Sequence, residues 1–406
     1  MESDAKSGPE SKGWMTRGVG AIGLASLLSD LGHEVPTCLL PSFLSSTLHA
    51  PASALGVIEG IADACAGVAR LAGGALSDDP ARRRSAAAGG YASTAVLASL
   101  IGVAASAWQV GVLRAGAWAS RGLRTPARNA LLADVVSPAS YGQAYGFERM
   151  MDNLGAIFGP LLAILLVGIF GTRPAIMISV IPGLLAAVAI LYAVRRTSRP
   201  AASQRERVKL TIRPLLRGRL GVLLGAASAF EMGNLAGTLL ILRATELIHH
   251  WRSETSAAQV ALLLYSLYNL TATLVSVPGG RAGDRHGMVP VLTAGAGAFL
   301  LAYIGFAFTA GSIPLLAGSF ALAGVGIGLA ETAETAAVAQ LAPTRLRGSA
   351  FGTLAGAQAA ANLAASAVAG ILWTAISPTA AFIYVAAWMV IALGGLTALD
   401  WAQRAA

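Results

Sequence analysis

The feature that most constrains this fold is a series of apolar runs, each long enough to cross a lipid bilayer as a helix. A bilayer core needs about 20 apolar helical residues, and backbone groups within lipid must be paired inside their own segment. Only 12% of the residues are charged, about half the share of a soluble domain. The sequence therefore predicts an all-α membrane protein with twelve transmembrane helices, at residues 18–47, 54–77, 86–107, 109–132, 141–170, 174–195, 219–247, 257–280, 288–309, 313–340, 348–375 and 379–402.

Lysine and arginine residues fall mainly in alternate segments between these runs, which predicts the orientation of the chain. If the N-terminus is cytoplasmic, the basic segments are cytoplasmic too, and an even number of spans returns the C-terminus to that side. The net charge of +9 follows from this topology. Because no basic, aromatic-rich soluble domain is present, we expect no nucleic-acid partner. The basic residues are Lys6, Lys12, Arg17, Arg82, Arg83, Arg84, Arg281, Arg285, Arg345 and Arg347, with nine more Lys or Arg in 195–219.

An internal repeat divides the chain into two halves. Residues 122–146 align with 328–352 at a constant offset of 206 residues, and the same offset places Asp78 on Asp284. Either match alone is common between Ala- and Gly-rich helices, but both at one offset indicate two homologous halves. We therefore expect a cytoplasmic tail, a six-helix bundle, a basic cytoplasmic linker and a second six-helix bundle, at residues 1–17, 18–195, 196–218 and 219–406.

Two six-span halves joined by a basic linker resemble the major facilitator superfamily of secondary transporters, over nearly the whole chain. The resemblance implies two pseudo-symmetric bundles around a central cavity, with a site near mid-membrane and alternating access by rocking. It also implies a monomer in a bacterial inner membrane. The polar N-terminus lacks the apolar core and cleavage site of a signal peptide, so we expect the first helix to remain as an anchor.

The loop at residues 74–84 resembles the superfamily signature G-x-x-x-D-R-x-G-R-[RK], and residues 280–287 resemble it in the second half. A carboxylate and arginines at the cytoplasmic mouth can form charge-assisted pairs that hold one conformation closed. The alternative is a tight turn whose arginines only set the orientation of the chain in the membrane. A carboxylate at Asp78 is needed neither for the turn nor for that orientation. We expect Asp78 to reach Asp134 through Arg82. The predicted gate comprises Gly74, Asp78, Arg82, Arg83, Asp134, Gly280, Asp284 and Arg285.

The fifth run contains Gly155, Gly159 and Pro160, which resemble the G-x-x-x-G-P core of a motif associated with drug/proton antiporters of the superfamily. Small residues four apart let two helices touch, and proline removes one backbone hydrogen bond. The usual following Gly-Gly is replaced by Ala163 and Ile164. The motif favours export over uptake, and the alternative is ordinary glycine-mediated helix packing.

Ionisable side chains within the apolar runs form the candidate site, because charge at membrane depth needs partners or a water-filled cavity. Asp30, His33 and Glu34 lie at i, i+3 and i+4 of the first run and share one helical face. An offset of 201 residues pairs Glu231 with Asp30 and Asn234 with His33. The candidates for proton coupling and the substrate cavity are Asp30, His33, Glu34, Glu59, Asp63, Arg114, Arg121, Arg124, Arg128, Glu148, Arg149, Asp152, Glu231, Asn234, Glu331 and Glu334.

Two interpretations of these groups stay open. Either they form structural ion pairs, or some carboxylates bind and release protons during transport because a cavity disfavours their charged form. A histidine beside Glu34 titrates near physiological pH, which favours coupling by at least one of Asp30, His33 and Glu34. Arg114 resembles the superfamily's fourth-helix arginine, for which the resemblance implies a role in coupling, and its alternative partners are Asp63 and Asp30.

The sequence thus predicts a non-enzymatic secondary transporter that exports a small solute in exchange for protons. Proton-coupled uptake is an alternative of the same class, and a non-transporting sensor or assembly component is a third. Substrate charge stays open, because the stripe of Arg121, Arg124 and Arg128 suits an anion whereas the second-half glutamates suit a cation. We expect no cofactor beyond the proton gradient, no metal site and no disulfide framework.

Overall fold

The computed structural model describes residues 13–196, 212–250, 253–309 and 312–404, and over these residues every regular element is helical. Residues 1–12 of the predicted tail and 197–211 of the predicted linker lie outside this description. The helices are α1 (Arg17–Ser42), α2 (Ala52–Ser77), α3 (Pro80–Leu100), α4 (Ala107–Val135), α5 (Tyr141–Phe170), α6 (Thr172–Ile178), α7 (Val180–Arg196), α8 (Gly218–Met232), α9 (Gly237–His249), α10 (Glu254–His286), α11 (Met288–Phe308), α12 (Ile313–Leu341), α13 (Arg347–Ala375) and α14 (Pro378–Arg404), with the short turns η1 (Phe43–Thr47), η2 (Ile101–Val103), η3 (Pro138–Ser140) and η4 (Thr344–Leu346).

The twelve predicted spans are confirmed over the described residues, and two of them are broken helices. The sixth span is α6 followed by α7, with the break at Ser179. The seventh is α8 followed by α9, with the break at residues 233–236. At the second break the backbone N–H of Leu235 donates to the hydroxyl of Tyr303 at 3.2 Å, which gives this unwound donor a partner.

Many large apolar side chains lie on the outer surface of this fold, and many ionisable side chains are buried inside it. Ile164 is 72% exposed and Leu263 is 70% exposed, whereas Arg114 and Glu334 are each 1% exposed. Nine of the described helical segments are long and apolar enough to cross a membrane. The spans formed by α1, α2 and α4 are not among these nine, and each of them carries several ionisable residues. This inside-out distribution suits a chain surrounded by lipid.

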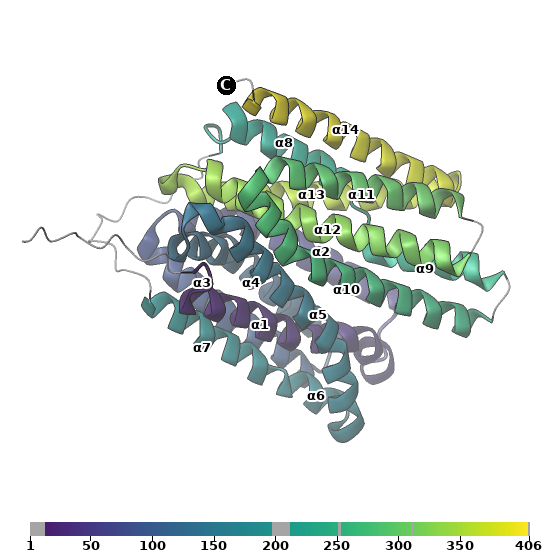
Figure 1. Cartoon of the computed structure of the whole chain (residues 1–406). Helices are drawn as coiled ribbons and strands as arrows, with labels where there is room; N and C mark the ends of the chain where they lie inside the picture. Colours follow the sequence, from purple (N-terminus) through teal and green to yellow (C-terminus); the bar gives the residue numbers. More distant parts are fainter. Residues whose placement is uncertain (1–12, 197–211, 251–252, 310–311, 405–406) are drawn as a thin grey trace, which may run out of the picture.

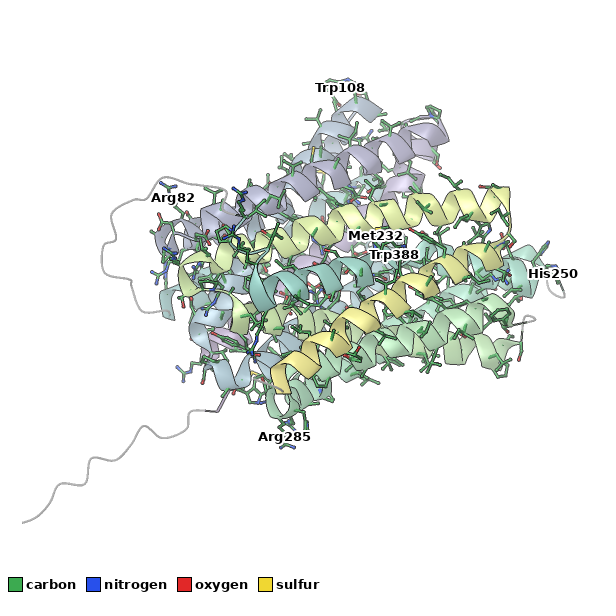
Figure 2. The ribbon with its side chains drawn as sticks, turned by 90° about the horizontal axis from the view of Figure 1, so that it is seen from above. Arg82, Trp108, Met232, His250, Arg285 and Trp388 are labelled. Atoms are coloured by element: carbon green, nitrogen blue, oxygen red, sulfur yellow. The ribbon has the colours of Figure 1, made fainter. Side chains whose placement is uncertain are left out.

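Helices α1–α7 form one bundle and α8–α14 form the other, with α8, α11 and α14 lying on the side opposite to α1, α6 and α7 (Figure 1). Arg82 and Arg285 lie toward one end of the molecule, and His250 lies at the opposite end (Figure 2). Because the charge distribution predicts that the end with Arg82 and Arg285 is cytoplasmic, it is called the cytoplasmic end below.

The two bundles approach each other closely at the cytoplasmic end, along α2 with α13 and along α5 with α10. A Cβ atom at Gly74 would lie 2.7 Å from the Cα of Gly352 and 2.8 Å from the carbonyl oxygen of Gly348. A Cβ atom at Gly142 would meet the carbonyl oxygen of Gly280. Glycine alone permits such backbone contact between helices. The cytoplasmic end is therefore closed by two equivalent helix crossings.

Candidate functional site

A carboxylate from each half binds the first turn of a helix in the other half. Asp78, which directly follows α2, accepts hydrogen bonds from the backbone N–H of Ser349 at 2.8 Å and from the Ser349 hydroxyl. Ser349 lies in the first turn of α13, where N–H groups lack helical partners and the helix dipole favours an anion. Burial raises the pKa of Asp78, and the bonds from Ser349 oppose this rise. Asp78, Gly348 and Ser349 are called the first latch.

The second latch consists of Asp284, near the end of α10, with Gly142 and Gln143 in the first turn of α5. Asp284 Oδ1 accepts from the backbone N–H of Gly142 at 2.7 Å. Its Oδ2 accepts from the backbone N–H of Gln143 at 2.9 Å and from the side-chain amide of Gln143 at 3.2 Å. Both latches thus place a carboxylate against the N-terminus of a helix in the opposite bundle.

The expected route from Asp78 to Asp134 through Arg82 is wrong by one residue. Arg83, not Arg82, is ion-paired with Asp134, and Arg83 Nε also donates to the carbonyl of Ser77 at 2.7 Å. Arg82 instead lies 3.4 Å from Asp79, the N-cap residue of α3. One residue turns a helix by about 100°, so Arg83 points toward α4 while Arg82 stays on the outer side.

Asp30, His33 and Glu34 of α1 lie in one ionic cluster with Arg121 of α4. Arg121 donates to Asp30 Oδ1 at 3.3 Å and also contacts the ring of His33. His33 Nδ1 lies 3.1 Å from the carbonyl oxygen of Ser29, and His33 Nε2 lies 3.4 Å from Glu34 Oε1. Asp30 and His33 are buried, whereas the Glu34 side chain is 23% exposed. Glu34 is therefore the most accessible of the three α1 residues.

Arg114 of α4 pairs with Glu59 of α2, which corrects the expected pairing with Asp63 or Asp30. Arg114 Nη2 and Glu59 Oε1 are 3.0 Å apart, and the Arg114 guanidinium carbon lies 3.4 Å from the centroid of the Trp118 ring. The two spans run in the same direction, and both residues lie about two turns from the start of their helices. Asp63 lies one turn further along α2 and is exposed.

A second ionic cluster lies nearer the cytoplasmic end and is centred on Arg128. Arg128 Nη1 lies 2.6 Å from Glu148 Oε1 and 3.5 Å from Asp152 Oδ1. Arg149 Nη1 lies 3.0 Å from Asp152 Oδ2, and Arg149 Nε lies 3.1 Å from Glu331 Oε2 on α12. The pair of Arg149 and Glu331 joins the two bundles, so this cluster links interior charge to the contact between the halves.

The predicted arginine stripe of α4 divides among three neighbouring helices. Arg121 faces α1, Arg128 faces α5, and Arg124 lies over the ring of Tyr91 on α3, with its guanidinium carbon 3.9 Å from the centroid. Arg124 is 3% exposed, and its Nη1 atom has no hydrogen-bond partner over the described residues. The three guanidinium groups are thus held separately in this conformation.

The glycines of the fifth-span motif bring α5 against the carboxylates of α1. A Cβ atom at Gly155 would lie 2.7 Å from the Cβ of Asp30, and one at Gly159 would meet the side chain of Glu34. Pro160 lies inside α5 without ending the helix. The motif therefore positions the backbone of α5 beside two members of the α1 cluster.

The second half contains a polar cluster formed by α8, α12 and α13. Gln358 Nε2 donates to Glu334 Oε2 at 2.7 Å and to Glu231 Oε1 at 3.3 Å. Asn234 Nδ2 donates to Glu231 Oε2 at 3.0 Å, and Asn362 Nδ2 donates to the backbone carbonyl of Asn234 at 3.1 Å. Gln358 and Asn362 are missing from the predicted site. Their signal is the presence of two amides in the Ala-rich stretch GAQAAANLAAS.

Comparison with known proteins identifies the family. The model of the Major Facilitator Superfamily matches residues 22–258 and again 222–401. The chain belongs to the major facilitator superfamily. An uncharacterized MFS-type transporter of Methanocaldococcus jannaschii is 26% identical over 388 residues, which cover 94% of this chain and 95% of that protein.

Solved structures of superfamily transporters share the fold. A bacterial homologue of the iron transporter ferroportin, in an outward-facing state, matches with a TM-score of 0.76 at 16% identity, over 95% of this chain and 100% of that one. The fucose:proton symporter of E. coli matches with a TM-score of 0.71 at 13% identity, over 94% and 98%. At such low identities these structures establish the fold alone.

Membership of the superfamily makes the chain a membrane transporter rather than an enzyme. In this fold the solute site lies between the two bundles near mid-membrane. The pair of Arg149 and Glu331, which crosses between the bundles, places the Arg128 cluster at that interface. Within the described parts of the chain, no group of three or more His, Cys, Asp or Glu side chains is arranged to hold a metal ion.

Proposed function

We propose that this superfamily transporter exports a small solute in exchange for protons by alternating access. The observation that carries the proposal is the closed cytoplasmic end, where two latches and the Arg149–Glu331 pair join the halves. Ionisable clusters lie between the helices beyond this closure. A state closed on one side is one of the two that alternating access requires. The likeness to a homologue in an outward-facing state supports this reading of the conformation.

The geometry of the α1 cluster supports a role for it in proton coupling. His33 lies between Arg121 and Glu34. A proton on its ring would attract Glu34 and repel Arg121, so protonation would redistribute the partners of α1. Gly155 and Gly159 hold α5 against the same face of α1, which supports export, as the fifth-span motif predicts. Coupling by at least one of Asp30, His33 and Glu34 stays a prediction.

Proton-coupled uptake is the second candidate. The fold is also similar to that of a fucose:proton symporter, and the same α1 cluster would serve a symporter if proton and solute bound together. For either direction we propose a monomer in a bacterial cytoplasmic membrane with both termini inside. This placement rests on the asymmetry of lysine and arginine along the chain.

Purified protein in liposomes with an imposed pH gradient, screened against pooled solutes, tests the proposal. We expect one pool to dissipate the gradient, with solute and protons moving in opposite directions. Glu34→Gln should weaken this response. Glu246→Gln is the matched control, because Glu246 is a partly buried carboxylate bound to Trp373 of α13, outside the α1 cluster.

The outcomes separate the three candidate functions. Movement of solute and protons in the same direction would replace export by uptake. A folded protein that responds to no pool would favour the non-transporting component. An equal response in wild type and Glu34→Gln would remove Glu34 from the coupling residues while leaving transport in place.

A further inference from the structure

We propose that the buried pair of Glu231 and Glu334 in the second half binds a proton during the exchange, as a second proton-binding place besides the α1 cluster, with Gln358 as the bridge between the two carboxyl groups. The proposal rests on the proton coupling proposed above and adds a site to it. Glu231 lies near the end of α8 and is 6% exposed, and Glu334 lies on α12 and is 1% exposed. One amide nitrogen, Gln358 Nε2, donates to both.

No cation of the described residues makes a direct ion pair with either carboxylate of this pair. Over the described residues, neither carboxylate has an ion-pair partner, whereas each buried acid of the first-half clusters contacts at least one arginine. Two arginines of the first half face the pair at longer range. Arg149 of α5 is already bound to Asp152 and Glu331, and Arg70 of α2 donates to the carbonyl of Ala355. The other titratable groups that face the pair are Glu331 of α12, Tyr268 of α10 and Tyr303 of α11.

Two negative charges at this place would be unstable. Burying an ionised carboxylate away from water is unfavourable unless a partner charge compensates it, and two carboxylates that share one donor also repel each other. A single proton on the pair removes the repulsion and leaves one charge for the surrounding amides to stabilise. The geometry therefore provides a place for one proton in the closed conformation.

The atoms around the pair favour a proton over a metal cation. Gln358 and Asn234 direct N–H groups, not oxygen atoms, at the carboxylates. A sodium ion would need oxygen ligands at these positions. The Oε1 atom of Glu334 is buried and has no hydrogen-bond partner within the described residues. This oxygen is the atom left free to bind the proton, and its burial shields the proton from solvent.

A link to the conformational change lies one helical turn away. Glu331 precedes Glu334 by three residues on α12, so both lie on the same side of the helix. Glu331 is the residue that binds Arg149 across the two halves. When the bundles rock apart at the cytoplasmic end, this pair must break, and the charges beside Glu334 change. Loading of the Glu231–Glu334 pair is thereby coupled to the contact that opens.

Infrared difference spectroscopy of the full chain in lipid nanodiscs, between alkaline and mildly acidic pH, tests the proton site directly. A protonated carboxyl group has a C=O stretching band that an ionised one lacks. We expect wild type to show a band that Glu334→Gln removes and Glu231→Gln removes or shifts. Glu246→Gln is the matched control, since it removes a partly buried carboxylate of the same half that binds Trp373 and not the pair, and it should retain the band.

Further measurements decide between the proposal and its competitors. A band that persists unchanged in Glu334→Gln and Glu231→Gln, or that is lost in Asp30→Asn instead, would overturn the proposal. So would loss of the band when Na⁺ replaces choline at constant pH, because the pair would then bind a metal cation. Distances between spin labels across the two latches (Ala81 with Thr344, and Ala139 with His286), equal in wild type and variants at alkaline pH, would confirm that the variants fold.

Failure of this proposal can be distinguished from failure of the proposed function. With the solute pool that responds in liposomes, Glu334→Gln should retain exchange of labelled for unlabelled solute without a gradient but should lose transport driven by the pH gradient. If wild type responds and Glu334→Gln behaves identically, the proton binds elsewhere. If the infrared band behaves as expected but no pool responds, the proton site stands and the transport proposal fails.

Discussion

The two latches at the cytoplasmic end have the same parts but different surroundings. Beside the first latch, Asp134 of α4 binds both Arg83 of α3 and Arg347 of α13, with Arg347 Nη1 3.7 Å from Asp134 Oδ1. Beside the second latch, no ion pair of the described residues involves a neighbour of Asp284, and the Arg149–Glu331 pair that also joins the halves lies about two turns further along α5. Arg285, next to Asp284 in the chain, is exposed and lies at the edge of the molecule (Figure 2).

This difference shows that homologous halves can share a geometry without sharing its reinforcement. The first latch has two electrostatic contacts between the bundles, the capping carboxylate of Asp78 and the Arg347–Asp134 pair. The second depends on Asp284 and on the backbone contact of Gly142 with Gly280. We therefore expect the second latch to open more readily when one of its parts is removed.

One measurement can follow both latches. Pulsed electron paramagnetic resonance between pairs of spin labels reports whether the helix ends are together or apart, in the full chain in nanodiscs. The label positions are exposed, and the two native cysteines are replaced by serine to avoid extra labels. The positions are Ala81 with Thr344 for the first latch and Ala139 with His286 for the second, with Cys38 and Cys65 as the replaced cysteines.

The largest effect is expected from Gly280→Ala. The added methyl group would meet the carbonyl group of Gly142, and both partners are backbone atoms that cannot move without separating the helices. Overpacking of this kind costs about 1–3 kcal/mol, which corresponds to about a 5- to 150-fold shift toward the open form. The distance between labels on Ala139 and His286 should increase. Gly297→Ala is the control, because its Cβ would meet nothing within 4 Å.

A closed second latch in Gly280→Ala would show that the helices can adjust by sliding, and would weaken the role given to the glycine contact.

The comparable change at the first latch, Gly74→Ala, should have a smaller effect. Its Cβ would lie 2.7 Å from Gly352 and 2.8 Å from Gly348, and the Arg347–Asp134 pair would still hold the bundles together.

Asp284→Asn is expected to open the second latch by a smaller amount. The asparagine keeps one acceptor but loses the charge that faces the first turn of α5, and it must direct an N–H group at a backbone donor. A carboxylate at a helix N-terminus contributes about 0.3–2 kcal/mol, so the open population should rise up to about 30-fold. The labels on Ala139 and His286 measure this change, and an unchanged distance would contradict the role given to Asp284 in the second latch.

Asp78→Asn should open the first latch less than Asp284→Asn opens the second. The same kind of charge is lost from the N-terminus of α13, but Arg347 remains paired with Asp134. The labels on Ala81 and Thr344 report the change. Asp79→Asn is the matched control, since it removes the neighbouring carboxylate, which caps its own helix through Ala81. An Asp78→Asn effect larger than that of Asp284→Asn would reverse the proposed ranking.

The sequence predicts the helices and the repeat well because both depend on local patterns. Apolar runs of bilayer length identify the twelve spans, and the offset of 206 residues pairs Asp78 with Asp284. The repeat also aligns Gly142 with Gly348, which are the helix starts that the two carboxylates cap. A repeat shows which residues are equivalent, but it does not show that each carboxylate caps the helix of the opposite half.

Side-chain partners are less predictable, because a single helical step changes the face on which a residue lies. Arg83 rather than Arg82 reaches Asp134, and Glu59 rather than Asp63 reaches Arg114. Which residues pair therefore depends on how each helix is rotated about its axis and on its depth relative to its neighbour, and a difference of about one turn changes the partner. The amide of Gln358 is missed for another reason, since a neutral side chain in an Ala-rich helix does not stand out by charge.

The smallest effect is expected from Asp134→Asn, and it decides whether reinforcement explains the difference between the latches. The Asp134 side chain is 30% exposed, and exposed ion pairs contribute about 0–1 kcal/mol and weaken with salt. Alone, Asp134→Asn should hardly change the label distance between Ala81 and Thr344. Combined with Asp78→Asn it should open the first latch as far as Asp284→Asn opens the second.

High ionic strength should have a similar effect on the Asp78→Asn variant, because it screens the remaining pair of Arg347 and Asp134. The second latch of Asp284→Asn should respond less to salt, since the ion pair between the halves on its helix, Arg149–Glu331, lies about two turns away from the latch. If the double variant at the first latch opens no further than Asp78→Asn, the ion pair does not reinforce that latch. The difference between the two contacts would then lie in their glycine crossings, which only the backbone substitutions can change.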